Sequence, residues 1–294
     1  MKEIIMVLVL LFIHVPLCYG LNWQTLHDAA DRQSLPDAEE AVQQNPDSVD
    51  DLYILGLTFL NLHKDQEAGE AFRNILSLRP DSLEAKWGVG EVLRRAHKLP
   101  ESENILNEIL KARPDFPPAL ISLAYIRYIQ MEFDEAVKLA YKVQKQGMDT
   151  VDLSNYVRAL LLVAGAKGMI AHYGGPLSKV INGTAVMPNL KKAEKLQPDS
   201  PGVMFGLGSF YFLAPGIIGG SQQKAEKYLK RTIELDPYFV DAYVRIAQLY
   251  SIKGDNAKYK EYLKKAEELD PKNEILLDFK SGACKFICAG GKEE

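Results

Sequence analysis

Prolines recur along this chain at an interval of 34 residues. Pro46, Pro80 and Pro114 form one series, and Pro237 and Pro271 show the same interval near the C-terminus. A fixed period of about 20 to 50 residues is typical of stacked structural repeats rather than of a single globular core. The sequence therefore predicts a stack of similar units along most of the chain.

The unit that ends at Pro80 carries two apolar stripes with helical spacing, separated by the polar stretch 61–65. The stripes consist of Leu52, Leu55, Gly56 and Phe59, and of Ala68, Phe72 and Ile75. Residues with this spacing lie on one face of a helix, and a proline cannot continue a helix. The unit is thus predicted to be a helix, a short turn and a second helix. Gly56, which has no Cβ, lets the two helices approach closely.

This pattern resembles the tetratricopeptide repeat (TPR), in which Trp or Leu-x2-Leu-Gly-x2-Tyr is followed by Ala, a Phe-like residue and Pro. Five units fit the same register between residues 47 and 271, although Met148 replaces the proline of the third. The last unit matches through Tyr243, Ile246, Ala247, Tyr250, Leu263, Ala266 and Pro271. The resemblance implies an all-α fold, a right-handed TPR α-solenoid of helix-turn-helix repeats. Because one helix pair cannot bury its own apolar face, neighbouring pairs are expected to stack.

The period also divides the chain into segments. These are a secretory leader (residues 1–20), N-terminal capping helices (21–46), three units (47–148), a degenerate unit (149–198), two further units (199–271), and a C-terminal capping helix with its tail (272–294). The degenerate unit holds an insert, residues 168–188, whose glycines and prolines predict loops around a short helix at Leu177–Ile181. The insert is either a functional element on one face of the solenoid or a spacer that adjusts the superhelix.

A second insertion lengthens the turn Leu213–Ser221, and Ser221 is expected to cap a helix at 222–235. This segment is either a plain elongated turn or a loop that contacts a ligand, since a helix N-terminus offers free N–H groups to an anion. It is similar to a turn of exported bacterial TPR proteins.

Residues 1–20 differ in character from the rest of the chain. An unbroken apolar run, Ile4–Ile13, follows Lys2 and is shorter than the roughly 20 residues that a membrane-spanning helix needs. The pattern favours a secretory signal cut before Leu21, so that the protein is exported to the periplasm or secreted. Two alternatives remain, a lipid anchor on Cys18 and an uncleaved leader, and contact with a membrane is expected only in those cases.

Removal of the leader leaves two cysteines, Cys284 and Cys288, with i, i+4 spacing. Two thiols in an oxidising compartment favour a disulfide, either within one chain at the end of a helix or between two chains. The alternative is that both pack as small apolar residues of the final helix. No further cysteine or histidine lies nearby in the sequence, so no metal site is predicted.

Composition and missing motifs exclude several classes of function. The chain has 294 residues, 47% of them hydrophobic and 25% charged, and a formal net charge of -4. It has no basic run, so it lacks the clustered Lys and Arg that hold a nucleic acid backbone. It also lacks the Gly-x-Ser-x-Gly, His-Glu-x2-His, Cys-x2-Cys and dinucleotide-binding glycine motifs, and its five histidines are scattered. We therefore predict that it is not an enzyme and binds no cofactor.

The resemblance places recognition on the concave surface, which the first helix of each TPR pair lines. Carried over by position, the expected partner-binding groove consists of Tyr53, Leu57, Trp87, Glu91, Arg94, Ile121, Tyr125, Tyr128, Phe205 and Phe212. Aromatic and aliphatic side chains favour an apolar or extended peptide. The Lys and Asn that would hold a terminal carboxylate are missing, apart from Asn155. In the alternative, the superhelix closes tightly and these side chains are buried against the N-terminal or insert helices.

The leading hypothesis is an exported, non-catalytic scaffold that binds a protein or peptide and assists assembly or maintenance of the cell envelope. Self-association is left open. The alternative is a periplasmic solute-binding partner of a transporter. The chain is loosely similar to the T-components of TRAP-type transporters, which are helical proteins with TPR-like units around an apolar pore. A closed tunnel lined by Tyr128, Phe205 and Phe212 would favour that alternative, and an open groove would favour the scaffold.

Overall fold

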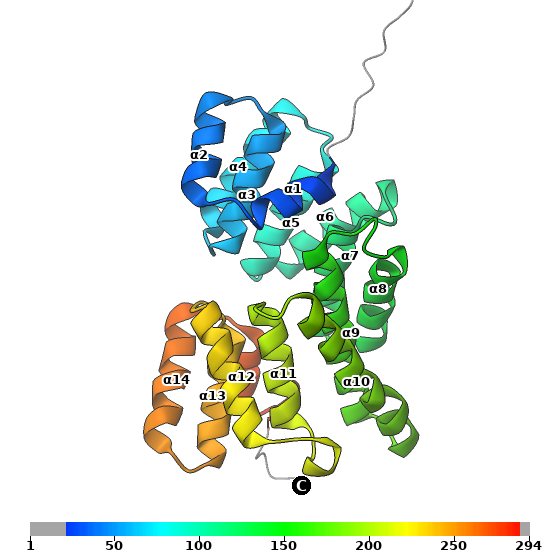
Figure 1. Ribbon diagram of the computed structural model, residues 1–294, viewed down its shortest axis with the longest axis vertical. Helices are drawn as coiled ribbons and strands as arrows, with labels where there is room; N and C mark the ends of the chain where they lie inside the picture. The colour runs from blue at the N-terminus through cyan, green and yellow to red at the C-terminus, as the bar shows by residue number, and fades with distance from the viewer. Residues whose placement is uncertain (1–21, 289–294) are drawn as a thin grey trace, which may run out of the picture.

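The computed structural model describes residues 22–288, and within that range the chain forms fifteen α-helices, one 3-10 helix and no strand (Figure 1). The α-helices are α1 (Trp23–Ala30), α2 (Leu35–Gln44), α3 (Val49–Asn61), α4 (Asp65–Leu78), α5 (Leu83–Arg95), α6 (Leu99–Ala112), α7 (Pro117–Ile129), α8 (Phe133–Gln146), α9 (Leu153–Tyr173), α10 (Pro176–Leu196), α11 (Pro201–Leu213), α12 (Gln222–Leu235), α13 (Val240–Ile252), α14 (Asn256–Leu269) and α15 (Glu274–Ser281). The 3-10 helix, η1, is Gly216–Ile218. None of these helices is both long enough and apolar enough to span a membrane. The predicted all-α fold is confirmed, whereas the predicted leader, with Cys18, lies outside the described residues.

From α3 onward the helices form pairs, α3 with α4 through α13 with α14, and successive pairs stack into a curved array (Figure 1). The turn inside each of the first three pairs has the same conformation. His63, His97 and Met131 stand 34 residues apart and have positive φ angles of 57°, 58° and 64°. A left-handed residue just past a helix satisfies its last carbonyls and reverses the chain. The predicted helix-turn-helix repeat is therefore confirmed in these units.

The degenerate unit departs from the loops expected of its sequence. Its helices α9 and α10 each contain 21 residues, and the insert lengthens both of them instead of interrupting the pair. Gly168 of α9 lies close to Val186 of α10, and Gly183 of α10 lies close to Ala171 of α9. The prediction of loops around a short helix at Leu177–Ile181 is wrong. Packing between the two helices outweighs the poor helix propensity of glycine, which costs only about 1 kcal/mol per residue.

The second insertion forms an extended turn between α11 and α12, with η1 at its tip. The Oγ of Ser221 accepts a hydrogen bond from the backbone N–H of Lys224 (3.3 Å). This is the cap of α12 that the sequence predicts, and it fixes the point at which the turn ends.

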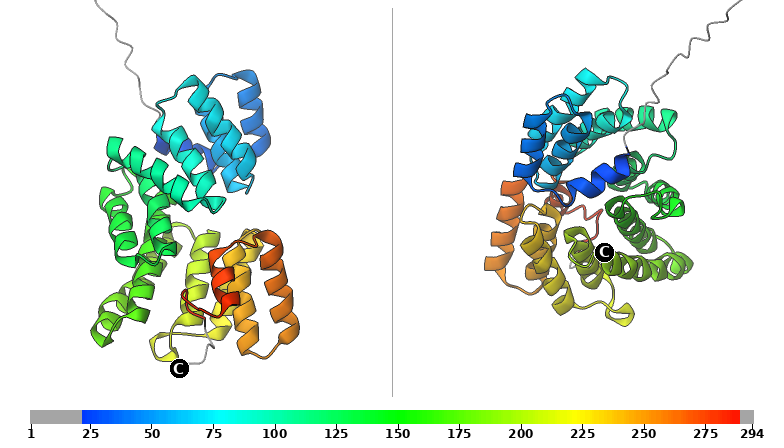
Figure 2. Two further views of the ribbon diagram at one scale, coloured as in Figure 1. Left: turned by 180° about the vertical axis from the view of Figure 1, so that it is seen from behind. Right: turned by 45° about the horizontal axis from the view of Figure 1, so that its top comes forward.

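The array curves until its last units meet its first ones (Figure 2). Nε2 of His63 lies 3.0 Å from Oδ2 of Asp236, and the two ring nitrogens of His97 lie 2.9 Å from carboxylate oxygens of Asp270 and Glu274. These five residues are here called the clasp. Both histidines stand in turns inside a helix pair, and both aspartates directly precede a proline. The two histidines are 34 residues apart, and so are the two aspartates. The clasp therefore joins the turns of two successive early units to equivalent positions of two successive late units.

Charge favours the clasp on both sides. Burial lowers the pKa of His97, but its hydrogen bonds to Glu274 and Asp270 outweigh that effect and raise the pKa above its ordinary value. For Asp236 burial acts in the opposite direction and raises the pKa, but the hydrogen bond to His63 holds that pKa below its usual range. The two shifts favour a charged His97 and an ionised Asp236, so electrostatic attraction strengthens the contact between the first and last units.

Close packing of α4 against α5 depends on a glycine. A Cβ added to Gly88 would lie 2.4 Å from Cγ of Phe72, whose side chain is fully buried. Gly88→Ala should therefore lower the free energy of unfolding by about 1–3 kcal/mol through overpacking, as measured by urea denaturation followed by circular dichroism. Gly165→Ala is the matched control, since its added methyl would meet Tyr128 at 3.6 Å, an ordinary contact. Equal losses in the two variants would contradict this account of the packing.

Candidate functional site

Helix α1 lies against the concave surface of the first units. The ring of Trp23 lies 5.7 Å from the ring of Phe116, and the ring of His27 lies 5.3 Å from the ring of Trp87. Nε2 of His27 is also 3.1 Å from the hydroxyl oxygen of Tyr53. Burial lowers the pKa of His27 to about 3, so its imidazole is neutral. Helix α1 therefore covers the N-terminal part of the expected groove.

A buried carboxylate, Glu91 of α5, lies beside this cover. It accepts hydrogen bonds from Nε (2.9 Å) and Nη2 (2.7 Å) of Arg94 and from Oγ of Ser122 (2.8 Å), and Nε of Arg95 lies 3.4 Å away. Ser122 in turn accepts a hydrogen bond from the indole N–H of Trp87 (3.0 Å). Burial raises the pKa of Glu91, but Arg94 and Arg95 outweigh that effect and hold the pKa well below its usual range. The network therefore engages three of the expected groove residues in contacts within the chain.

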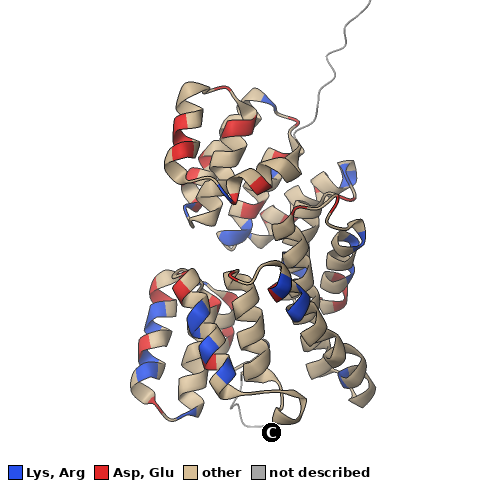
Figure 3. Ribbon diagram, in the orientation of Figure 1, with Lys and Arg blue, Asp and Glu red and all other residues tan. Residues whose placement is uncertain are grey.

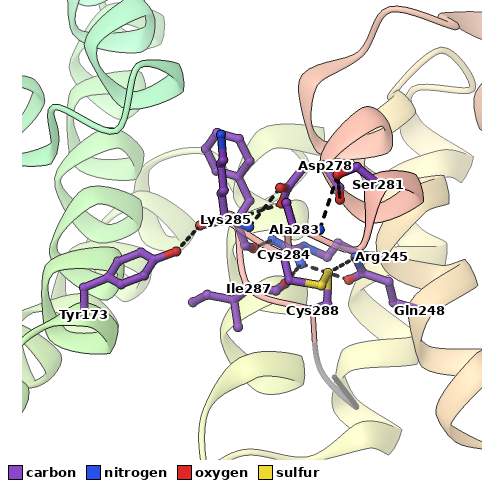
Figure 4. Close-up of a disulfide and its surroundings, with 11 residues drawn as sticks. Tyr173, Arg245, Gln248, Asp278, Ser281, Ala283, Cys284, Lys285, Ile287 and Cys288 are labelled. Carbon is purple, nitrogen blue, oxygen red and sulfur yellow. Dashed lines mark hydrogen bonds between the residues drawn. A yellow bond between two sulfur atoms is a disulfide. The ribbon is translucent and has the colours of Figure 1, made fainter. Parts of the chain in front are cut away.

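Residues 282–288, here called the C-terminal loop, cover another part of the concave surface (Figure 4). Arg245 of α13 donates from Nη2 to the carbonyl oxygen of Phe286 (2.6 Å) and from Nη1 to that of Ile287 (2.5 Å). The guanidinium is buried, and burial lowers the pKa of Arg245. Among the described residues no carboxylate forms an ion pair with it. Because a buried cation needs partners, the two loop carbonyls and Oε1 of Gln248, which accepts from Nη1 (2.9 Å), hold this side chain, while its Nε has no partner among the described residues.

Two further side chains hold the main chain of the C-terminal loop. The carboxylate of Asp278 accepts hydrogen bonds from the N–H groups of Lys285 (2.9 Å) and Phe286 (2.8 Å). The hydroxyl of Tyr173 donates to the carbonyl oxygen of Lys285 (2.7 Å). The loop is thus bound through its backbone by α9, α13 and α15 together (Figure 4).

One side chain of the loop, Phe286, is buried. Its ring stacks on Tyr128 with 5.8 Å between centroids, and it lies in an apolar cluster with Phe133, Ala166 and Met169. Burial raises the pKa of Tyr128 to about 12, so this wall of the pocket is uncharged at neutral pH. The pocket combines α7, α8 and α9 and accepts one aromatic ring.

A disulfide closes the C-terminal loop. Cys284 and Cys288 are bonded to each other just past the end of α15, and Nε2 of Gln248 lies 3.9 Å from Sγ of Cys288. Among the arrangements that the sequence left open, the structure contains the bridge within one chain at the end of a helix. The bridge encloses Phe286 and Ile287, whose carbonyls accept hydrogen bonds from Arg245.

None of the ten residues expected in the groove is exposed. Tyr53, Leu57, Trp87, Glu91, Ile121 and Phe212 are buried, and Arg94, Tyr125, Tyr128 and Phe205 are partly buried. The guanidinium carbon of Arg94 lies 4.3 Å from the centroid of the Tyr125 ring. Helix α1 and the C-terminal loop cover the concave wall, which corresponds to the closed alternative and not to an open groove.

The side chains expected to line a solute tunnel pack against other parts of the chain. Phe205 lies against Phe239 with 4.9 Å between ring centroids, Phe212 is buried in the core, and Tyr128 stacks on Phe286. A cavity of about 20 Å³ beside α1 has room for about one water molecule. The packing of Phe205, Phe212 and Tyr128 does not support the solute-binding alternative. As a separate point, residues 22–288 bring together no three His, Cys, Asp or Glu side chains that could hold a metal ion.

Sequence reasoning missed Arg245, Asp278 and Tyr173. A signal existed for Arg245, because it is the single charge in the largely apolar run Tyr243–Tyr250, and a buried charge is almost always paired. No local pattern marks Asp278 or Tyr173, since their role depends on segments that are distant in sequence.

Comparison with known proteins agrees with this architecture. Residues 240–273, which span α13 and α14, match the family model of the tetratricopeptide repeat. Among solved structures, a tetratricopeptide repeat protein from Parabacteroides merdae is 17% identical with a TM-score of 0.52, and the match covers 88% of this chain and 96% of that one. No curated protein matches the chain by sequence.

Two further solved structures share the fold. The Cut9–Hcn1 hetero-tetramer of the APC/C gives a TM-score of 0.56 at 13% identity, covering 90% of this chain and 48% of that one. The IFIT1 monomeric mutant with Gppp-AAAA gives 0.55 at 16% identity, covering 85% of this chain and 59% of that one. At such identities the likeness establishes the fold alone.

Proposed function

We propose that this chain, which has the fold of tetratricopeptide-repeat proteins, is a non-catalytic scaffold that binds a segment of a partner protein on its concave surface. Proteins of this fold are commonly scaffolds for protein interactions. The observation that carries the proposal is the C-terminal loop, which lies on the concave surface as a bound peptide would. The proposed site is the place that this loop occupies, formed by Arg245, Asp278, Tyr173 and the pocket around Phe286.

The contacts indicate what kind of segment fits. Arg245, Asp278 and Tyr173 bind main-chain atoms of the loop, so they accept a backbone of the same shape whatever its other side chains are. The pocket between Tyr128 and Phe133 holds an aromatic ring, which supplies specificity. The expected partner therefore presents a turn or short loop that carries one aromatic residue.

The proposed compartment is the periplasm or the cell exterior. The leader expected at residues 1–20 supports it, and so does the disulfide between Cys284 and Cys288, because disulfides persist in oxidising compartments. The proposal includes a role in assembling or maintaining the cell envelope. A lipid anchor on Cys18, which would hold the exported chain at the membrane, is the alternative to free export.

Supplying the loop as a separate peptide tests the site. A chain that ends at Ser281 keeps Arg245, Asp278 and Tyr173, and an oxidised synthetic peptide with the sequence of residues 282–288 is added in a calorimetric titration. The truncated chain should bind this peptide. Arg245→Met should weaken binding at least about tenfold, because a hydrogen bond to a charged group contributes about 1.5–3 kcal/mol.

Arg231→Met is the matched control, since Arg231 is an exposed arginine of α12 and should leave the affinity unchanged. A peptide with Ala at the position of Phe286 should bind more weakly than the native sequence. If the truncated chain folds but binds no peptide, or if Arg245→Met binds as tightly as the parent, the site is wrong.

A further inference from the structure

The most exposed aliphatic side chains of the described residues gather at one end of the molecule. Leu177, Val180 and Ile181 on α10 are 74%, 63% and 57% exposed, and Ile217 and Ile218 in the α11–α12 turn are 95% and 58% exposed. These five residues are here called the apolar end. Every other large aliphatic side chain between residues 22 and 288 is less than half exposed. The apolar surface is therefore concentrated and not scattered.

The two parts of the apolar end project from the same end of the molecule. Helix α10 contains 21 residues and α11 contains 13, so the first turns of α10 extend about 12 Å beyond α11 at 1.5 Å per residue. Figure 1 and the left view of Figure 2 show these turns and the α11–α12 turn at the same end of the molecule. Ser178 of α10 faces α9, since its Oγ donates to the carbonyl of Ile170 (3.2 Å). Leu177, Val180 and Ile181 share a different face of the helix, which no other helix covers.

The α11–α12 turn holds its isoleucines outward in a fixed conformation. The N–H groups of Ile218 and Gly220 donate to the carbonyl of Pro215 (3.0 and 3.1 Å), and the N–H of Ser221 donates to the carbonyl of Tyr211 (2.7 Å). A Cβ on Gly220 would lie 1.8 Å from the carbonyl oxygen of Ala214, so only glycine fits there. The exposure of Ile217 and Ile218 is thus set by a hydrogen-bonded backbone.

The segments that form the apolar end carry positive charge only. The first turns of α10 contain Lys179 and the first turn of α12 contains Lys224, and no acidic residue lies in residues 153–193 or 200–225. The next acidic residue of α12, Glu226, pairs with Lys230 and Lys253. The whole chain has a net charge of -4, so this end differs in sign from the rest. Figure 3 shows acidic residues spread over the other helices and none on the first turns of α10 or on the α11–α12 turn.

We propose that the apolar end docks on the surface of an anionic lipid bilayer, with Ile217, Ile218, Leu177, Val180 and Ile181 entering the interface and the lysines facing lipid headgroups. Apolar side chains next to cations are the pattern of proteins that lie on such surfaces. The side chains project outward from a helix end and a turn. A yielding hydrocarbon layer accepts such projections. This proposal is independent of the peptide site on the concave surface.

Vesicle flotation tests the proposal with the chain from Leu21 to Glu294, which contains every described residue. Vesicles of phosphatidylglycerol and phosphatidylcholine should carry the protein upward, and vesicles of phosphatidylcholine alone should carry much less. Ile217→Ser combined with Ile218→Ser should reduce the partition coefficient at least about tenfold. Lys179→Glu combined with Lys224→Glu should reduce it on anionic vesicles only.

Leu78→Ser combined with Ile252→Ser is the matched control, because both residues are exposed aliphatics on other helices, and it should float like the parent chain. Circular dichroism checks that every variant remains folded. Absence of flotation with the parent chain overturns the proposal. Unchanged flotation of the isoleucine variant also overturns it. If the parent chain binds no lipid but forms a protein complex that the isoleucine substitutions disrupt, this end binds a protein partner and the proposal is wrong.

Discussion

Replacement of Glu91 by alanine should lower the free energy of unfolding by about 3–5 kcal/mol, the cost of removing one partner from a buried ion pair. The carboxylate of Glu91 is buried and is the acceptor for Arg94 and Ser122, with Arg95 nearby. Without it, Arg94 loses its counter-charge and Arg95 keeps only Asp65, in a region that α1 covers. Urea denaturation at neutral pH measures the loss.

The exposed pair of Glu135 and Lys138 supplies the control for Glu91. Glu135→Ala should cost no more than about 0.5 kcal/mol, because surface ion pairs contribute little. A loss for Glu91→Ala as small as that of Glu135→Ala would refute the structural role of the network.

The effect of Glu91 should also depend on pH. Arg94 and Arg95 hold the pKa of Glu91 in the folded chain below its value in the unfolded chain, in spite of burial. A carboxyl with a depressed folded pKa contributes its full stabilisation above the unfolded pKa of about 4.3 and loses it as the pH falls toward the folded pKa. The difference in stability between the parent chain and Glu91→Ala should therefore be largest at neutral pH and shrink below about pH 4.

Trp87→Ala should lower the free energy of unfolding by about 3–5 kcal/mol. Trp87 is 2% exposed, its ring packs against His27 and Phe72, and its indole N–H donates to Ser122. Alanine would leave a cavity between α1 and the first units. Urea denaturation gives the size of the effect, and faster proteolysis within α1 should accompany it, because α1 loses the contact of His27 with Trp87.

Trp87→Phe separates the two contributions of Trp87. Phenylalanine retains most of the packing and loses the hydrogen bond to Ser122, so the loss should be about 1–2 kcal/mol. If Trp87→Ala and Trp87→Phe destabilise the chain equally, packing against α1 is not what Trp87 supplies.

The regular part of the fold could be predicted from the sequence because it is local and periodic. The interval between Pro80 and Pro114 equals the length of one helix pair with its turns, and the turns at His63 and His97 recur at the same interval. The insert could not be interpreted in the same way. Its glycines and prolines have the composition of loops, and only the contact of Gly168 with α10 shows that they serve helix packing.

The concave surface could be predicted from the sequence only in part. Repeat positions identify Tyr53 and Trp87 as residues of the inner wall, and both do lie against α1. The period does not report how tightly the array curves, however, and the curvature decides whether the wall is open. The hydrogen bonds from Arg245 and Tyr173 to the C-terminal loop join segments more than 40 residues apart. No local sequence pattern encodes such contacts.

The clasp changes how such an array is expected to lose its structure. In an open solenoid each unit contacts only its neighbours, so the ends can fray one unit at a time while the middle persists. Here His63 and His97, in the turns inside the first two helix pairs, bind Asp236, Asp270 and Glu274 across 173 residues of sequence or more. The terminal units then have no free edge from which to unravel, and melting of either end removes support from the other. The molecule should behave as one cooperative ring, in which a partner that opens the clasp loosens both halves together.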